Sequence, residues 1–523
     1  MSDKKPEKKT KNKSNWYLPP LKRRDFLRGS AGGMAGAWLS AWPWQQLSAQ
    51  QDLNPVTDDW DAGIVRHLLP AVNESQFLIK TSFTRALRET PRLRIQNGGS
   101  GRFIEGCLND TSGEFWQFYA TELEADTEYQ LSLQDSSGNA LCEPWPLSTF
   151  PSPQQNPERV RVLFYTCAGG PEGEYFGIND RRGNLPIAIR QRLLRRGLSF
   201  SPQAAVANGD HIYWDLHTWQ GDQAGELSPA GQQSNFDFAA RVMGGSNEEA
   251  MKLAAGPQIA PLYGTAFRST PVYFLQDDHD HWENDSPLTY PVPWFQLQLA
   301  RTTQQLYYPE FLPDATRSPG LPYSTSSARG ELSESFGTMR YGQLLEVLLY
   351  DVRRTMSVGE LNGVFLDSNV ENWLVQRTES KDTRHLVHVP SNPPGWTAGK
   401  WGEWYPDMLH PETGQLTTQI PKPHWQQGWL NQHDRIMQSL ADMKHRNPLV
   451  IAGDLHATGV GTMYGAGNLD FSDNPITNIL CGPVGTSIRG FPSVVRGVSA
   501  APSQYLDFQE QVPPIEEHGF TIV

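Results

Sequence analysis

The sequence has few charged residues, a deficit of basic residues beyond its first 28 positions, and no long apolar run. Charged residues make up only 19% of the 523 positions, which excludes a disordered, highly charged chain. No stretch of about 18 uninterrupted apolar residues occurs, so no ordinary membrane span is expected. Residues 1–28 carry a net charge of +7, which leaves −20 for the rest, since the whole chain has −13. So acidic a body excludes broad nucleic-acid binding, but it suits a small charged substrate if the site supplies cations.

Cysteine is also scarce, with four residues in the chain. Cys107 and Cys142 lie in one early segment and could pair in an oxidising compartment, although spacing alone does not establish the geometry of a disulfide. Cys481 ends the apolar run 476–481 and is expected to be a small buried residue. Cys167 differs from these three because it comes at the end of a strand-like run, directly after Tyr165 and Thr166.

The first fifty residues indicate an export signal. The segment Lys22-Arg23-Arg24-Asp25-Phe26-Leu27-Arg28 precedes a stretch rich in Gly and Ala, residues 29–44. This pattern resembles a twin-arginine signal and therefore implies the twin-arginine export machinery as a partner. We expect residues 1–50 to be a leader and the protein to be exported to the periplasm or exterior of a bacterium. The alternative is a basic tail followed by a buried helix.

Residues 51–153 are expected to form a small all-β domain. Leu123 and Tyr129 lie six residues apart, as in the tyrosine-corner segment of fibronectin III-like sandwiches. The domain would end at the proline-rich stretch 148–153. It is either a binding module or a packing partner of the rest of the chain. The predicted strands are Phe77–Phe83, 93–95, Phe115–Ala120 and 129–133.

Residues 154–523 mix β-prone runs with helical patterns, which predicts an α/β domain with layered sheets. The expected strands are 159–165, 204–207, 271–275, 344–350, 385–389 and 449–452. The expected helices are 185–196, 367–377 and 429–444. Segments 214–265 and 390–426 have no clear periodicity, and we interpret both as excursions around a site. Five tryptophans crowd the second excursion, either as a local core or as stacking surfaces for a ligand.

Four of the strand-like runs end in residues that bind metals. Cys167 ends the first, Asp210 the second with Tyr213 close behind, Asp277-Asp278-His279-Asp280 the third, and Asp454-Leu455-His456 the fourth. Sites in open α/β sheets form where the carboxyl ends of strands meet loops. Taken singly, each element has another explanation: a turn or helix cap for Gly-Asp, a buried inert thiol for Cys167. In combination they favour a metal site, because so many acids packed together need cations.

The order Cys, Gly-Asp-x-Ile-Tyr, Asp-Asp-His-acid, Gly-Asp-x-His resembles the alkaline phosphatase D (PhoD-like) family of calcineurin-like metallophosphoesterases. The similarity extends to Tyr350-Asp351-Val352-Arg353, which resembles the family's Leu-Asp-x-Arg strand end. It implies a layered, mixed β-sheet metallophosphoesterase sandwich preceded by the small fibronectin III-like domain. The chain departs from the family pattern at Asp280, where Glu is usual, and at Gln276, where Trp is usual.

The resemblance also implies roles for seven residues. Cys167, Asp210, Tyr213 and His456 would hold a ferric ion, and Asp210 would bridge to a second metal, expected to be calcium. Asp278 and Asp454 would bind that second metal, and His279, the expected catalytic residue, would contact the phosphate or the leaving group. Thiolate and phenolate are anionic donors suited to Fe³⁺, whereas carboxylates suit Ca²⁺. Alternatives stay open for Tyr213 as a buried aromatic, for His279 as a structural residue, and for Arg353 as a partner of Asp351 or a phosphate ligand.

The sequence therefore predicts an exported, metal-dependent phosphoester hydrolase, an alkaline phosphatase or phosphodiesterase that uses a metal-activated hydroxide. The rival hypothesis is a noncatalytic envelope binding protein built on a degenerate phosphoesterase fold. The presence of all the candidate ligands favours the enzyme. Preference for monoesters or diesters depends on the lining of the two excursions, which the sequence does not reveal.

Overall fold

The computed structural model describes residues 59–170, 184–214, 236–282, 285, 290–317, 321–322 and 332–523. The predicted leader, residues 1–50 with its twin-arginine pattern, lies outside the described residues. Pro55–Val523 form one compact unit, so the predicted domain boundary near residue 153 stays a prediction.

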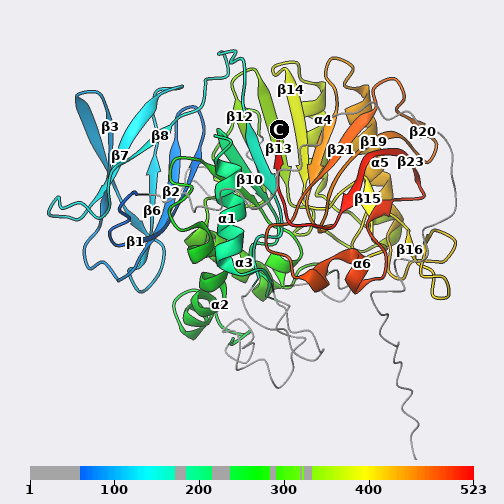
Figure 1. Cartoon of the computed structure of the whole chain (residues 1–523), viewed down its shortest axis with the longest axis horizontal. Coiled ribbons are helices and arrows are strands. Elements are labelled where there is room, and N and C mark those ends of the chain that lie inside the picture. The colour runs from blue at the N-terminus through cyan, green and yellow to red at the C-terminus, as the bar shows by residue number, and fades with distance from the viewer. Residues whose placement is uncertain are drawn as a thin grey trace, which may run out of the picture. The chain divides into compact units, whose positions relative to one another are not determined.

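The first described part of this unit is all-β (Figure 1). It holds two four-stranded antiparallel sheets with the orders β1-β2-β6-β5 and β4-β3-β7-β8. The strands are β1 Val65–Val72, β2 Phe77–Phe83, β3 Arg92–Asn97, β4 Ser100–Glu105, β5 Cys107–Leu108, β6 Phe115–Ala120, β7 Glu128–Gln134 and β8 Trp145–Ser148. The predicted strands coincide with β2 and β6 and lie inside β3 and β7, whereas β1, β4, β5 and β8 were not predicted.

Tyr129 lies in β7, at the position expected of a tyrosine corner. Its hydroxyl accepts a hydrogen bond from the backbone N–H of Glu124 at 2.8 Å. Such a bond back to the upstream backbone is the contact that defines this corner. The fibronectin III-like assignment of the whole domain stays a prediction.

All four cysteines are free. Cys107 is exposed and Cys142 is buried, so the structure shows no disulfide between them. Cys481 is fully buried, as the apolar run around it predicted.

The rest of the unit contains a four-stranded and an eight-stranded sheet, together with helices, which confirms the predicted mixed α/β class. The first has the order β11-β10-β9-β24, with β9, β10 and β11 parallel. Its strands are β9 Val162–Tyr165, β10 Ala204–Asn208, β11 Val272–Leu275 and β24 Thr521–Ile522. The second has the order β12-β13-β14-β18-β21-β19-β20, with β13, β14, β18 and β21 parallel and β23 paired to β19. Its strands are β12 Phe336–Tyr341, β13 Leu345–Tyr350, β14 His385–Pro390, β18 Leu449–Ala452, β19 Thr458–Ala466, β20 Leu469–Asp470, β21 Ile476–Cys481 and β23 Leu506–Ile515.

The two sheets and the helices form four layers, because alternate side chains of each strand point to opposite faces of its sheet. In β9, Val162 and Phe164 join the core that also holds Val347 of β13, so the two sheets pack face to face. Leu163 and Tyr165 of the same strand face the other way, toward helices α1–α3. Helices α4 and α5 cover the outer face of the larger sheet. The helices are α1 Ile187–Leu198, α2 Ser246–Tyr263, α3 Trp294–Tyr307, α4 Ser368–Glu379, α5 Gln427–Asp442 and the short α6 Pro492–Val495.

Both predicted excursions contain regular structure. Helix α2 occupies the second half of segment 214–265, of which residues 215–235 lie outside the described part. The sequence did not predict this helix for two reasons. Most of its residues are buried, on several faces, so the sequence has no amphipathic period, and Pro257 and Pro261 lie within it. Segment 390–426 carries the short strands β15 Trp396–Thr397, β16 Met408–Leu409 and β17 Leu416–Thr417. β15 pairs with β22 Ala501–Pro502.

The tryptophans of the second excursion pack into two buried clusters, Trp396 into one and the other four into the outer core. Trp396, Trp404 and Trp429 are almost wholly buried, and Trp401 and Trp425 pack against the same outer core as α4 and α5. This favours the interpretation as a local core over that of stacking surfaces for a ligand.

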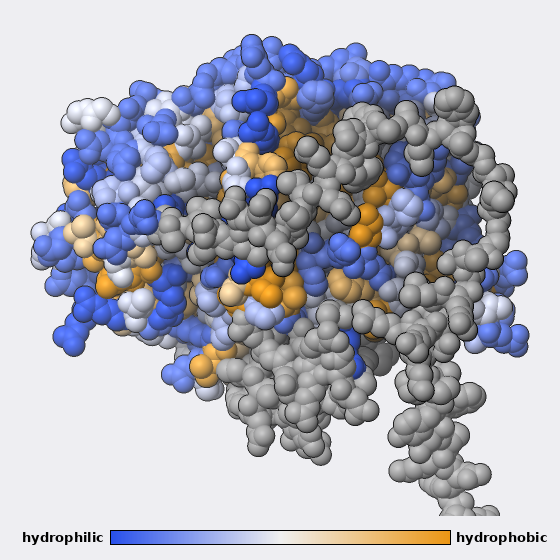
Figure 2. Space-filling view, viewed as in Figure 1, coloured by the Kyte–Doolittle hydropathy of each residue, from blue (hydrophilic) through white to orange (hydrophobic). Residues whose placement is uncertain are grey.

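The face drawn in Figure 2 carries hydrophobic patches between wide hydrophilic areas. Within the described residues, every helix is too short or too polar to cross a bilayer.

Candidate metal centre

The four strands singled out in the sequence end at one edge of the layered sheets. β9 leads through Thr166 to Cys167, and β10 leads through Asn208 and Gly209 to Asp210. β11 leads to Asp277 and Asp278, and β18 leads to Asp454. β10 lies between β9 and β11, so three of these ends are adjacent in one sheet. A hydrogen bond between the Asn208 side chain and the Pro390 carbonyl (3.0 Å) ties this edge to the larger sheet.

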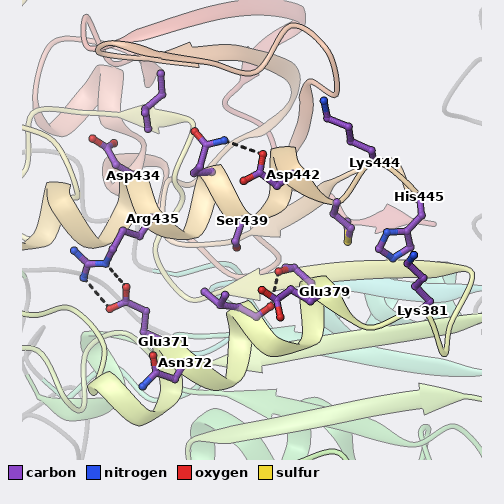
Figure 3. Close-up of a pocket in the computed structure, with 15 residues that line it drawn as sticks. Glu371, Asn372, Glu379, Lys381, Asp434, Arg435, Ser439, Asp442, Lys444 and His445 are labelled. Atoms are coloured by element: carbon purple, nitrogen blue, oxygen red, sulfur yellow. Dashed lines mark hydrogen bonds and ion pairs between the residues drawn. The ribbon is translucent and has the colours of Figure 1, made fainter.

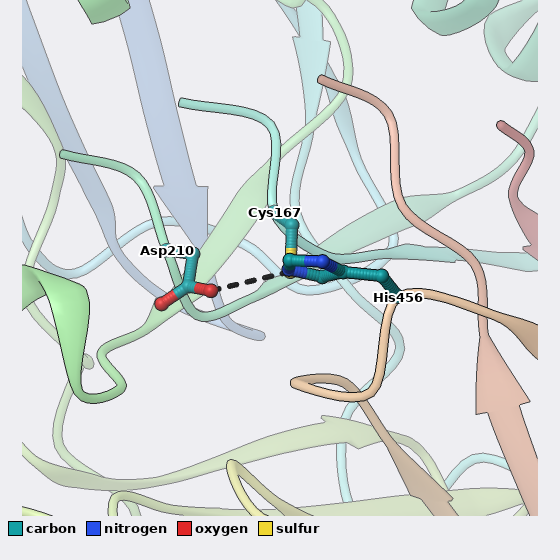
Figure 4. Close-up of side chains that lie close together, drawn as sticks. All are labelled: Cys167, Asp210 and His456. Carbon is teal, nitrogen blue, oxygen red and sulfur yellow. Dashed lines mark hydrogen bonds between the residues drawn. The ribbon is translucent and has the colours of Figure 1, made fainter. Parts of the chain in front are cut away.

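A first group of side chains gathers around Asp210 (Figure 4). Ligand atoms of Cys167, Asp210 and His456 all lie within 4.8 Å of one another. The Cys167 Sγ is 3.3 Å from Oδ2 of Asp210. The Tyr213 hydroxyl donates to the same oxygen at 3.2 Å. The four residues that were predicted to hold a ferric ion therefore meet at one point.

A second group shares Asp210 with the first. Ligand atoms of Asp210, Asp278 and His279 lie within 4.8 Å of one another, as do those of Asp277, Asp278 and Asp454. The rings of His279 and Tyr213 have centroids 4.1 Å apart. The structure thus brings together all seven residues that the sequence singled out, with Asp210 between the two groups as a bridging ligand would lie.

Three of the clustered residues have left-handed backbone conformations. The φ angle is 50° at Cys167, 60° at Asp210 and 61° at Asp454. This region is costly for residues with a side chain and is retained mainly where surrounding structure enforces it, often at functional sites. In each case the strand ends and the turn directs the side chain into the cluster.

Burial dominates the electrostatics of the first group. It raises the pKa of the Cys167 thiol well above its ordinary value, and the nearby Asp210 carboxylate adds to the effect. Burial likewise raises the pKa of the Tyr213 phenol and, despite the opposing charge of His279, that of Asp210. Burial lowers the pKa of His456 to about 3, so this imidazole is neutral near pH 7. Thiol and phenol lose their protons in such a place only beside a cation.

His456 is oriented by a backbone carbonyl. Its Nδ1 lies 2.6 Å from the carbonyl oxygen of Gly490, at the end of the 3₁₀ helix η9 (Ile488–Gly490). A neutral imidazole must donate there, which leaves Nε2 as the atom with a free lone pair. Metal-binding histidines are held in this way. The surroundings of Gly490 are tight, because a Cβ at that position would come within 2.8 Å of the Thr486 methyl group.

Asp280 holds the strand ends together. Its Oδ2 accepts hydrogen bonds from the backbone N–H groups of Asp210 (2.8 Å) and Asp277 (3.0 Å). Its Oδ1 accepts from those of His211 (2.9 Å) and Ile212 (3.0 Å). One carboxylate therefore fixes the backbone of both the β10 and the β11 ends, which gives this fourth acid of the motif a positioning role.

Helix α2, which the sequence did not reveal, also positions the site. Gln258 accepts hydrogen bonds from the backbone N–H groups of Gly170 and Tyr213, both at 2.9 Å. The first follows the Cys167 turn and the second carries the phenol. The first excursion therefore contributes directly to the geometry of the cluster.

The guanidinium of Arg353 does not pair with Asp351, the protein partner proposed for it. The group lies among other acids: Nε donates to Asp277 at 2.8 Å and Nη1 to Asp285 at 2.5 Å. Asp351 instead meets the guanidinium of Arg354 and lies 3.0 Å from Nε2 of His281. Burial alone would lower the pKa of Arg353, but the surrounding carboxylates raise it well above its ordinary value.

Lys400 is a site residue that the sequence did not reveal. Its Nζ lies 2.7 Å from Oδ1 of Asp454 and 2.6 Å from Oδ2 of Asp285. Burial opposes the charge of this lysine, yet the carboxylates hold its pKa well above its ordinary value. The available signal was weak: a single lysine between two glycines, in the segment Gly399-Lys400-Trp401-Gly402, within an excursion already assigned to a site.

A separate surface groove of about 1080 Å³ lies between helices α4 and α5, and none of the seven predicted site residues lines it (Figure 3). Two pairs of its lining residues are hydrogen-bonded to each other. Arg435 donates to Glu371 at 2.9 Å and Gln438 to Asp442 at 3.0 Å. The groove therefore offers no cluster of chemistry comparable to the metal centre.

No known protein family matches the chain in a family scan, and a search of curated proteins finds no match either. Among solved structures, the chain is similar to the structure of PhoD, with 13% identity, 82% of this chain and 78% of that chain covered, and a TM-score of 0.49. It is also similar to a purple acid phosphatase from seeds of yellow lupin (Lupinus luteus), with 11% identity, 87% and 69% covered, and a TM-score of 0.49. At this level of similarity the function has to be argued from the site itself.

Proposed function

We propose that this chain is a metal-dependent phosphoester hydrolase, an alkaline phosphatase or phosphodiesterase of the PhoD-like kind. One observation carries the proposal: strand ends that are far apart in the sequence place a thiol, a shared carboxylate, a phenol and an imidazole at one buried point. A second acidic group and a histidine lie directly beside it. This combination has little structural use without a cation, because burying acids together is unfavourable unless positive charge offsets it.

The donors of the first group fit a ferric ion. Asp210 Oδ1 is buried and has no hydrogen-bond partner among the described residues, so it has a lone pair to offer. Cys167, Asp210, Tyr213 and the free Nε2 of His456 would hold the ion, and thiolate and phenolate are donors that favour Fe³⁺. When bound, this ion supplies Lewis-acid charge and lowers the pKa of water, which makes a nucleophile available at moderate pH.

The second group fits the predicted calcium ion less well. Ca²⁺ takes six to eight oxygen ligands. Both oxygens of Asp454 already have partners: Oδ1 meets Lys400 at 2.7 Å and Oδ2 meets the Asn392 amide at 3.0 Å. Asp278 keeps one buried oxygen, Oδ2, without a hydrogen bond in the described part of the chain. We therefore assign no step of the reaction to calcium.

The chain's own residues supply the remaining chemistry. His279 lies against Tyr213 and within the Asp210–Asp278 group, where a protonated imidazole can donate to the departing alkoxide. Arg353 and Lys400 offset the acids around them, which allows a phosphate anion to approach. Asp280 and Gln258 keep the strand ends in place, so the site is preorganised before substrate binds.

Export by the twin-arginine route, to the periplasm or the exterior, is part of the same proposal. It is supported by the Arg23-Arg24 pair and the weakly apolar stretch after it. That route carries folded proteins, which suits a protein that acquires its metal before export.

The proposal is tested with the purified full-length protein and a panel of aryl phosphate monoesters and diesters. We expect hydrolysis that a chelator abolishes and that iron restores. Full activity of the metal-free protein would refute a metal-dependent reaction. A folded, iron-loaded protein that cleaves neither ester class would instead favour the noncatalytic binding protein.

A further inference from the structure

The acidic half of the centre already contains two fixed cations. Besides Asp277 and Asp285, the Arg353 guanidinium lies near Asp454 (3.5 Å) and Asp278 (3.9 Å). The Arg353 side chain is fully buried. A buried guanidinium stays charged, and the four carboxylates around it are its counter-ions. The Arg353 charge therefore neutralises part of the negative charge of the site itself.

Lys400 completes this balance from the opposite side. Its ammonium lies between Asp454 and Asp285, at 2.7 and 2.6 Å, and 3.9 Å from Oδ2 of Asp278. Two of these three carboxylates, Asp454 and Asp278, are the residues assigned to a second metal by resemblance. The ammonium thus occupies Oδ1 of Asp454, one of the two oxygens with which this residue would bind an ion.

The backbone around Lys400 is built to hold it there. The buried carboxylate of Glu403 accepts hydrogen bonds from the backbone N–H groups of Ala398 (2.7 Å) and Lys400 (3.0 Å). The Arg496 guanidinium donates to the carbonyls of Ala398 (2.8 Å) and Gly399 (2.6 Å). A lysine that merely swings into an acidic cleft needs no such support, so the loop is preorganised around the ammonium.

The opposite wall of the loop is equally close. The Gly402 carbonyl accepts hydrogen bonds from Arg353 (3.0 Å) and from the Asn392 amide (3.2 Å). A Cβ at position 402 would overlap Oδ1 of Asp285 and Nη1 of Arg353. Glycine at this position lets the loop backbone lie directly against Asp285 and Arg353.

We propose that the second positive charge of this centre is the ammonium of Lys400, backed by Arg353, and that the centre binds one metal ion instead of two. The inference rests on the proposed function only in placing that ion in the Cys167 group. A calcium ion bound to Asp454 would have to displace an ammonium that three carboxylates hold, and the two like charges would repel at close range.

The first experiment counts metals in the wild-type protein. Full-length protein is dialysed against buffer with excess Ca²⁺, freed of unbound ions on a desalting column, and analysed for elements. We expect one iron and no calcium per chain. One iron together with one retained calcium would overturn the inference, and this result needs no variant that must fold.

The second experiment removes the ammonium. Lys400→Met keeps the aliphatic stem but leaves Asp454 and Asp285 without their cation, so this variant should bind Ca²⁺ at least about tenfold more tightly than wild type in a calorimetric titration. Lys381→Met, which changes an exposed lysine elsewhere, is the matched control and should leave Ca²⁺ binding unchanged. A folded Lys400→Met protein that binds no more calcium than wild type would overturn the inference.

Asp454→Asn separates the one-metal and two-metal hypotheses further. If Asp454 served a second metal, this variant would lose one ion per chain relative to wild type; in the one-metal centre the count stays at one iron. An active hydrolase with two metals would refute the inference and leave the proposed function standing. An inactive wild-type protein with one iron and no calcium would support the inference and refute the proposed function.

Discussion

Asp280 is the residue whose substitution tests the geometry of the centre most directly. In Asp280→Asn, one carboxylate oxygen becomes an amide NH₂ that faces backbone donors. Because each oxygen accepts two backbone N–H groups, two of the four lose their acceptor whichever way the amide turns. The two bonds that remain also lose the benefit of a charged acceptor.

The size of the effect can be worked out from these four bonds. A buried donor left without a partner costs about 1–3 kcal/mol, so two of them cost about 2–6 kcal/mol. The Asp280 charge also works to raise the pKa of Asp210, so its removal relieves some repulsion and offsets part of this cost. With metal bound, that repulsion is already screened, and we expect the iron-loaded variant to lose about 3 kcal/mol or more in free energy of unfolding.

The assay is urea unfolding of iron-loaded protein, combined with hydrogen exchange followed by mass spectrometry. Peptides that cover residues 208–212 and 275–278 should exchange faster in Asp280→Asn, whereas a peptide covering β2 should not change. Asp473→Asn is the control, because the Asp473 side chain is 87% exposed and, among the described residues, pairs only with an exposed lysine. A loss below about 1 kcal/mol with unchanged exchange at the strand ends would refute the role given to Asp280.

Four other perturbations test separate parts of the molecule. Asp210→Asn should lower turnover of an aryl phosphate by about 100-fold or more, and a variant that keeps over about a tenth of the wild-type rate would show that Asp210 does not hold the metal. The iron-loaded enzyme should have a visible charge-transfer band that Tyr213→Phe shifts or bleaches; a colourless protein containing stoichiometric zinc would contradict the iron assignment. Burial lowers the pKa of His67 to about 4, so as the pH falls the histidine is protonated in the unfolded chain before it is protonated in the folded protein. The free energy of unfolding should therefore be unaffected by His67 above about pH 6.5 and should fall by roughly 3 kcal/mol toward pH 4. His67→Gln should flatten this dependence in urea unfolding. Changing Arg23 and Arg24 together to Lys should trap the protein in the cytoplasm, and unchanged secretion on cell fractionation would exclude the twin-arginine route.

The ligand positions could be predicted from the sequence because each follows a short apolar, β-prone run. Parallel strands bring their carboxyl ends to one edge, so residues as distant as Cys167 and Asp454 could be expected to meet without knowledge of the loops. Residue type then limited the chemistry, since thiol, phenol and imidazole together suit few ions other than iron or its neighbours.

The cations and supports of the site could not be predicted in this way. Lys400 and Glu403 lie in a segment with no period, and their partners are defined only by tertiary packing. Gln258 lies on a helix buried on most sides, where the contrast between polar and apolar faces that marks a helix is absent. Arg353 was noticed beside Asp351, its neighbour in sequence, but its side chain pairs with Asp277 and Asp285, which only the fold brings near.

The pairing of β24 with β9 has a consequence for how the protein is made. Thr521 and Ile522 are hydrogen-bonded to the strand that leads to Cys167, and Val523 exchanges two backbone hydrogen bonds with Val162. On the ribosome, the free edge of β9, the strand that leads to Cys167, is therefore covered only after residues 521–523 have been made. Until then the free edge of β9 is open to chaperones and to other nascent chains. The finished centre would then depend on the synthesis of residues 521–522 as well as on the arrival of iron.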